Sequence, residues 1–195
     1  MTEFVLSFVH TFASNIETFD ALVAELAPDI PVRHTVHGDL LTQALDAGEL
    51  TADIRRRAAE AIVNEAENGA SVVLCTCSTV GPGADDAAGL TATKVMRVDR
   101  PMAEAAVRIG GRIGVVATLA TTLGPTLDLL SEAAVQAGKE IDLRAVVFEE
   151  ARDKLLAGDM ESYLSIIAEG LHRTALDSDV IVLAQASMSP ALKLC

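Results

Sequence analysis

Two cysteines end the apolar run "SVVLCTC" at residues 71–77, shortly before a Gly-Pro break. A cysteine thiolate can act as a nucleophile or exchange a proton with a substrate. Cys77 is expected at the carboxyl end of a strand, where the positive end of the following helix favours thiolate over thiol. Cys75 lies deeper in the strand and is expected to be a small buried hydrophobe. We therefore predict that Cys77 is the reactive thiol. The alternative, that both cysteines only pack the strand, stays open.

Polar side chains surround the predicted position of this thiol. Ser78 and Thr79 follow Cys77 directly and supply hydroxyls and backbone donors suited to a substrate carboxylate. His10 ends the first predicted strand, where it is placed to assist Cys77 as a base or to orient a substrate. The alternative for His10 is a hydrogen-bonded core histidine.

The elements that must position these residues alternate between strands and helices. Apolar runs predict strands at 4–11, 32–38, 71–77, 94–98, 112–118, 143–149 and 179–185. Ala- and Leu-rich segments predict helices at 14–27, 51–68, 101–109, 122–138 and 159–177. This alternation predicts an α/β fold with parallel sheets flanked by helices.

The chain also resembles itself. Residues 71–82 align without a gap on residues 179–190, an offset of 108, and residues 5–11 fall on residues 113–119 at the same offset. We interpret this as a duplication that gives two pseudo-symmetric lobes. The alternative is that any two buried strands followed by a Pro-started helix look alike.

The predicted lobes are residues 1–98 and 99–195, and no low-complexity linker separates them. At the offset of 108, the strand predicted at 94–98 would recur near residue 202, but the chain stops at Cys195. The second lobe is therefore expected to lack its last strand and helix.

Gln185 occupies the position in the second lobe that matches Cys77. A glutamine side chain forms hydrogen bonds but cannot serve as an acid or base at neutral pH, so we expect Gln185 to orient a substrate. Ser187 lies close by, and Thr118, Thr121 and Thr122 close another strand-to-helix junction with hydroxyls. The threonines suit a carboxylate, and they also suit an ordinary helix cap.

Composition narrows the class of protein. The net charge is −13, and the tight basic run at 55–57 is typical of a solvated helix face, so no nucleic-acid partner is expected. No apolar stretch reaches the length of a membrane span, which predicts a soluble, cytoplasmic protein without a membrane partner. Three cysteines indicate reduced thiols, because an odd number at this spacing does not make a disulfide framework. Without a zinc-type spacing, a phosphate loop or a dinucleotide fingerprint, neither a metal nor a cofactor is expected.

Four stretches resemble the aspartate/glutamate racemase superfamily, which includes hydantoin racemases, maleate isomerases and arylmalonate decarboxylases. "CST" at 77–79 is similar to the family's first cysteine motif, and "VDRPMAEAAVR" at 98–108 is similar to its crossover between lobes. "IGVVATLATT" at 113–122 resembles the strand and threonine turn of its second lobe. Residues 149–190 are similar over their whole length to family members.

The resemblance implies two α/β lobes with the active site in the cleft between them. It also implies two cysteines that exchange a proton on opposite faces of a carboxylate substrate, without metal or pyridoxal phosphate. The family's second motif usually reads Gly-Cys-Thr, where this chain has Ala184, Gln185 and Ala186. Racemisation by two thiols is therefore not expected. A single first-lobe cysteine resembles the nucleophile of the maleate isomerases, which adds to an alkene and lets the carbon–carbon bond rotate.

We therefore predict a cofactor-independent isomerase that acts on a small carboxylate through Cys77, and the resemblance suggests a homodimer. Three alternatives remain open: a catalytically inactive carboxylate-binding protein on the same fold, a one-cysteine decarboxylase, and an enzyme that acts on hydantoin or other ring-amide substrates. In the decarboxylases, however, the retained cysteine lies on the second lobe.

Overall fold

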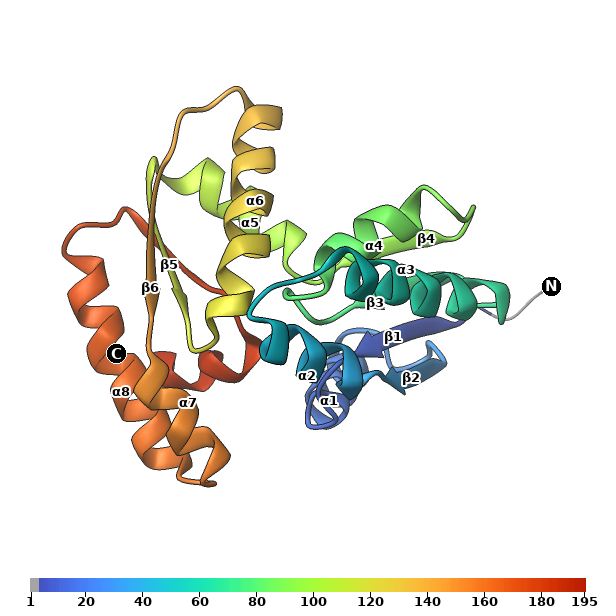
Figure 1. Ribbon diagram of the computed structural model, residues 1–195, viewed down its shortest axis with the longest axis horizontal. Helices are drawn as coiled ribbons and strands as arrows, with labels where there is room; N and C mark the ends of the chain where they lie inside the picture. Colours follow the sequence, from blue (N-terminus) through green and yellow to red (C-terminus); the bar gives the residue numbers. More distant parts are fainter. Residues whose placement is uncertain (1–3) are drawn as a thin grey trace. The chain divides into compact units, whose positions relative to one another are not determined.

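The computed structural model describes residues 4–195 and divides into two compact units (Figure 1). The first unit ends at Val98 and the second begins at Asp99; residues 1–3, which the expected first lobe includes, lie outside the described residues. Each unit contains one parallel sheet flanked by helices. The predicted α/β class with two parallel sheets is therefore confirmed.

The first unit alternates strands and helices along its length. Its elements are β1 Leu6–His10, α1 Asn15–Leu26, β2 Val32–Val36, α2 Gly38–Ala47, α3 Ala52–Glu67, β3 Val72–Cys75, α4 Gly81–Ala88 and β4 Lys94–Arg97. The strands are parallel and lie in the order β2-β1-β3-β4. Thr51 begins α3 by accepting a hydrogen bond from the backbone N–H of Ile54, which satisfies one of the free donors at the helix start.

Helices cover both faces of the first sheet. On one face, Phe8 of β1 contacts the Phe19 ring of α1. On the other face, Val9, Val73 and Cys75 belong to an apolar core with residues of α2, α3 and α4. Because successive side chains of a strand point to opposite faces, Phe8 and His10 share the α1 face, and Val9 points to the other core.

The second unit repeats this arrangement with three strands. Its elements are α5 Arg100–Ile109, β5 Arg112–Ala117, α6 Ala120–Ala137, β6 Asp142–Val147, α7 Glu149–Leu156, α8 Met160–Ala175, β7 Val180–Leu183 and the 3-10 helix η1 Ala186–Leu194. The strands are parallel, in the order β6-β5-β7. One core packs α5 and α6 against β5 and β7, and a second core packs α7, α8 and η1 on the other face. Figure 1 shows α6 and α8 on opposite sides of β5 and β6.

The two sheets share a strand order but differ by one residue in register. Leu6 pairs with Val72 in the first sheet, and Ile113 pairs with Val180 in the second. The offset is 108 between Val72 and Val180, as the sequence predicts, but 107 between Leu6 and Ile113. The predicted match of residues 5–11 with 113–119 is therefore wrong by one residue. Apolar character alone does not fix the register of a strand that is buried on both faces.

All seven predicted strands are present, whereas three α-helices were not among the predicted ranges. They are α2, which follows β2 after one residue, α4, which was expected after Cys77 but was given no range, and α7, which begins inside the run predicted as a strand at 143–149. No strand pairs with the free edge of β7 in residues 4–195, so the described part of the second sheet has no counterpart of β4.

Candidate functional site

The two cysteines of the first unit differ in exposure. Cys75 is the last residue of β3, is 1 % exposed, and donates its thiol hydrogen to the carbonyl oxygen of Cys77 at 3.7 Å. Cys77 is half-buried at the carboxyl edge of the sheet and packs partly against the core of α3 and α4. Of these two cysteines, Cys77 is therefore the more accessible.

A short turn separates Cys77 from the helix that follows it. Residues 78–80 form this turn, in which the N–H of Gly81 donates to the carbonyl oxygen of Ser78 at 3.2 Å, and α4 begins at Gly81. Cys77 therefore precedes the first residue of α4 by four positions, and the turn 78–80 lies between them. Ser78 and Thr79 follow Cys77 in this turn after β3, where Ser78 is half-buried and Thr79 is buried.

His10 ends β1, is fully buried, and uses both ring nitrogens within the first unit. Its Nδ1 lies 2.7 Å from Thr76 Oγ1, and its Nε2 lies 2.8 Å from Nδ1 of His34. The Nε2 of His34 in turn lies 3.0 Å from a carboxylate oxygen of Asp20. Neither ring nitrogen of His10 is left over for a substrate, so its direct hydrogen-bond partner at the sheet edge is Thr76.

The environment of His10 favours its neutral form. Burial and, to a smaller extent, the nearby His34 lower its pKa from 6.5 to about 4, and the Asp20 carboxylate partly opposes the shift. The His10 ring also stacks on Phe8 at 5.8 Å and contacts Phe19 at 5.7 Å, measured between ring centres. Two phenylalanine rings therefore contact a histidine that is uncharged at neutral pH.

In the second unit, Gln185 is held by Thr118. The backbone N–H of Thr118 donates to Gln185 Oε1 at 2.6 Å, and the Thr118 hydroxyl donates to the same oxygen at 3.0 Å. A backbone N–H can only donate, so this contact fixes which end of the Gln185 amide is the oxygen. The half-buried amide nitrogen finds no acceptor among residues 4–195, and it is available as a donor at this sheet edge.

The remaining predicted residues of the second unit lie nearby in sequence but have different partners. Thr121 and Thr122 are buried in the first turn of α6, and Thr121 Oγ1 has no hydrogen-bond partner in the described part of the chain. Ser187 Oγ lies 2.8 Å from the hydroxyl of Tyr163 of α8. Burial raises the pKa of Tyr163, while hydrogen bonds with Ser187 and Thr118 partly oppose the rise.

Sequence reasoning missed four residues that the structure connects to the predicted ones. They are Asp20, His34 and Thr76, which form hydrogen bonds with or through His10, and Tyr163, which contacts Ser187. His34 could have been found from the register between β1 and β2. In that register Phe8 pairs with His34, so His34 lies diagonally beside His10. That pairing cannot be known before the sheet order is known.

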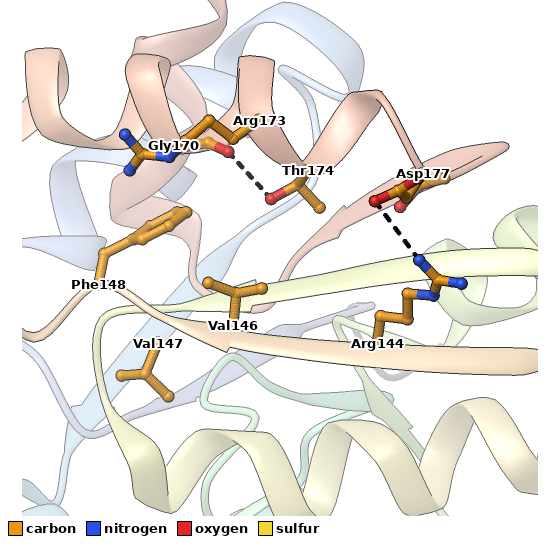
Figure 2. Close-up of a pocket in the computed structure, with 9 residues that line it drawn as sticks. Arg144, Val146, Val147, Phe148, Gly170, Arg173, Thr174 and Asp177 are labelled. Carbon is orange, nitrogen blue, oxygen red and sulfur yellow. Dashed lines mark hydrogen bonds and ion pairs between the residues drawn. The ribbon is translucent and has the colours of Figure 1, made fainter.

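A separate pocket of about 390 Å³ lies between β6 and the end of α8 (Figure 2). Arg144 and Asp177 form an ion pair at 3.6 Å on its wall, and Thr174 donates to the carbonyl oxygen of Gly170. None of the residues predicted from the sequence as site residues lines this pocket. Its lining mixes both signs of charge with apolar side chains, and we do not include it in the candidate site.

No group of three or more His, Cys, Asp or Glu side chains is arranged to hold a metal ion in residues 4–195. No helix in this range is both long and apolar enough to cross a bilayer.

Comparison with known proteins identifies the family. The family model described as Asp/Glu/Hydantoin racemase matches residues 9–194, whereas no curated protein is significantly similar in sequence. Glutamate racemase isoform RacE1 from Bacillus anthracis has 13% identity and a TM-score of 0.63, covering 100% of this chain and 72% of its own. Glutamate racemase from Aquifex pyrophilus has 14% identity and a TM-score of 0.63, covering 97% and 82%. Aspartate racemase from Picrophilus torridus has 10% identity and a TM-score of 0.66, covering 96% and 83%. The chain therefore belongs to the Asp/Glu/Hydantoin racemase family and has the fold of these racemases.

Proposed function

We propose that the protein is a cofactor-independent isomerase that acts on a small carboxylate through the single thiol of Cys77. The observation that carries the proposal is the pair of matching sheet edges: a half-buried thiol follows β3 in the first unit, and an amide, Gln185, follows β7 in the second. Family membership supports an isomerase, and the pair of edges supports chemistry with one thiol rather than two.

The first edge offers a nucleophile with hydrogen-bond donors beside it. Cys77 is followed by Ser78 and Thr79, and the backbone turns there into α4. Hydroxyl and backbone N–H donors of this kind suit carboxylate oxygens. In this proposal Cys77 serves as the nucleophile or as the single acid/base, and Ser78 and Thr79 hold the substrate.

The second edge offers hydrogen bonds but no second acid or base. Gln185 presents its NH₂ group because Thr118 holds its oxygen, so it is suited to an oxygen atom of a substrate. The buried, unpartnered hydroxyl of Thr121 at the start of α6 also suits an anionic oxygen. Reversible proton transfer between two thiols is unavailable to a chain with glutamine at this position.

The test compares three thiols of one chain. Iodoacetamide labelling is followed by peptide mass spectrometry from pH 6 to pH 9, with exposed Cys195 as an internal reference and buried Cys75 as a second one. Labelling is repeated with maleate, D- and L-aspartate, and D- and L-glutamate. An activated Cys77 is expected to label faster than Cys195 at neutral pH, and a bound carboxylate is expected to protect it.

Turnover of the same compounds is followed by proton NMR in D₂O and by chiral chromatography, which separates isomerisation, racemisation and decarboxylation. Cys77→Ser is expected to lower kcat at least about a thousandfold, whereas Cys75→Ser keeps most of it. Full turnover by Cys77→Ser would refute the assignment. Protection of Cys77 without any turnover would favour the alternative of a carboxylate-binding protein.

Two further expectations stay predictions. The family resemblance suggests a homodimer, and sedimentation of the purified protein measures its oligomeric state. The cytoplasmic location is measured by fractionation of cells that express it.

A further inference from the structure

Four side chains of the first unit form one continuous chain of hydrogen bonds. It runs from Thr76, after β3, through His10 of β1 and His34 of β2 to Asp20 of α1, with heavy-atom distances of 2.7, 2.8 and 3.0 Å. One end is a buried hydroxyl at the carboxyl edge of the sheet, and the other is a carboxylate that is 51% exposed. The chain therefore connects the sheet edge with solvent over α1.

The donor of each bond follows from the carboxylate. Ionised Asp20 can only accept, so His34 donates from Nε2, and the Nδ1 of a neutral His34 must then accept. His10 consequently donates from Nε2 to His34, and its own Nδ1 accepts from the hydroxyl of Thr76. In this state both imidazoles are neutral and both carry their proton on Nε2.

The same positions accommodate one additional proton without movement of any heavy atom. A proton arriving at Thr76 Oγ1 lets Thr76 pass its own proton to Nδ1 of His10, which passes its Nε2 proton to Nδ1 of His34. The Thr76 hydroxyl then donates to the carbonyl oxygen of Val9, which lies 3.3 Å away. One proton has entered, every bond between His34 and Thr76 has reversed, and the positive charge rests on His34 beside Asp20.

We propose that Thr76, His10, His34 and Asp20 form a proton relay between the carboxyl edge of the first sheet and the surface over α1. The hydroxyl of Thr76 can donate either to Nδ1 of His10 or to the carbonyl oxygen of Val9. This choice of two acceptors allows the hydrogen bonds between Thr76 and His34 to reverse direction. His34 takes the charge because its side chain is 12% exposed and contacts the carboxylate.

The surroundings of His10 suit a group that passes a proton on rather than keeping it. The charged or titratable groups that act on it are His34 from β2 and Asp20 from α1. The segment after β3 contributes the Thr76 hydroxyl, and Phe8 and Phe19 contact the ring. Burial is the main cause that lowers the pKa of His10 to about 4, so its cationic form is disfavoured at neutral pH. His10, in the middle of the relay, is fully buried.

The use of the relay in catalysis rests on the proposed function. Thr76 directly precedes Cys77, and the proton that the relay accepts would come from the Cys77 thiol or from a substrate bound at that edge. The relay itself does not require Cys77 to react, and this makes the two proposals separable. Thr76, His34 and Asp20 are relay residues that act through one another and not catalytic residues.

The first experiment is a pH titration of the full chain by long-range ¹H–¹⁵N NMR, which reports the protonated nitrogen of each histidine. At high pH, His10 and His34 are both expected in the Nε2–H form. On acidification, His34 is expected to gain its second proton while His10 switches to Nδ1–H at the same pH. Independent titration of the two rings, or a His10 that never changes tautomer, would overturn the relay.

Variants at the two ends of the relay test the proposal. Thr76→Val removes the hydroxyl but keeps the shape, and it is expected to abolish the coupled tautomer switch. Asp20→Asn keeps an acceptor oxygen but removes the charge, so proton uptake by the pair is expected at lower pH. The controls are Asp29→Asn and His37→Gln, at an exposed and a half-buried residue outside the relay. Both are expected to leave the tautomer switch in place.

Kinetics test the catalytic use with whichever of maleate, aspartate or glutamate the wild type converts. Thr76→Val and Asp20→Asn are expected to lower kcat about 10- to 100-fold with KM nearly unchanged, and Asp29→Asn is expected to change neither. A coupled switch in the wild type together with unchanged kcat in both variants would overturn the catalytic use and leave a structural network. No conversion by the wild type, with the switch still present, would overturn the proposed function and not the relay.

Discussion

Burial of His10 links its protonation to the stability of the fold. The pKa is about 4 in the folded state and 6.5 for an exposed histidine, so between these values the unfolded chain binds a proton that the folded chain lacks. Stability is therefore expected to be complete above about pH 6.5 and to fall as the pH drops toward 4. By linkage, the loss between pH 7 and pH 5 is about 2 kcal/mol.

Urea unfolding at pH 7 and pH 5 measures this loss. His10→Gln is expected to be less stable at pH 7 but to lose most of the difference between the two pH values, whereas the control His37→Gln keeps it. An unchanged pH dependence in His10→Gln would show that another group is responsible. The comparison uses the slope with pH and not the absolute stability, because removal of His10 also removes one hydrogen-bond partner of Thr76 and one of His34.

Some of the candidate site could be predicted at the level of single residues, and some could not. Cys77, Ser78 and Thr79 form one contiguous segment after an apolar run, so their common location at a strand end follows from sequence. The contact between His10 and His34 joins residues 24 positions apart and depends on the pairing of β1 with β2. Local patterns carry no information about which strands become neighbours.

At the scale of elements, the contact between α3 and α4 requires a residue without a side chain. A Cβ added at Gly83 would lie 2.7 Å from Cβ of Ala58 and 2.8 Å from the carbonyl oxygen of Arg55, both in α3. Backbone atoms of a helix cannot move aside as a flexible side-chain end can. Gly83→Ala is therefore expected to push α4 away from α3 and to cost about 1–3 kcal/mol of unfolding free energy.

Chemical denaturation of Gly83→Ala and of a matched control measures this cost. In Gly38→Ala, at the first residue of α2, the nearest neighbour of the added Cβ is the carbonyl oxygen of Thr11 at an ordinary 3.6 Å, and alanine favours the helix. The control is expected to be as stable as the wild type or more stable. A Gly83→Ala variant as stable as Gly38→Ala would contradict the close approach of the two helices.

The sequence predicted the strands well and the short helices poorly. All seven strands were found, because β-branched runs bounded by polar residues mark buried parallel strands. The helix α2 escaped prediction because it follows β2 after a single residue and begins with a glycine. The helix α7 is only eight residues long and has one buried residue, Ala151, so its sequence shows little periodicity.

At the scale of the whole molecule, the charge is strongly unbalanced. The chain has 28 acidic and 15 basic residues, which gives a net charge of −13 at pH 7. Repulsion between like charges opposes the compact state, and salt screens it. Raising NaCl from 20 to 200 mM at pH 7 is therefore expected to raise the melting temperature by a few degrees. This shift corresponds to a gain of about 1 kcal/mol in unfolding free energy for a chain of this size.

Calorimetry at the two salt concentrations checks this expectation. Exposed ion pairs such as Arg112–Asp179 weaken in salt and act in the opposite direction. A melting temperature that falls with added salt would mean that these pairs outweigh the general repulsion. Potassium chloride serves as a control, because screening depends on ionic strength and not on the identity of the cation.

The continuity of each unit along the chain has a consequence for synthesis. The sheet and the core of the first unit draw only on residues up to Val98, and its last strand, β4, pairs with β3. The second sheet and its two cores draw only on residues after that point. A nascent chain leaves the ribosome from its N-terminus. The first sheet can therefore complete its strand pairing as soon as β4 emerges, while the codons of the second unit are still being translated.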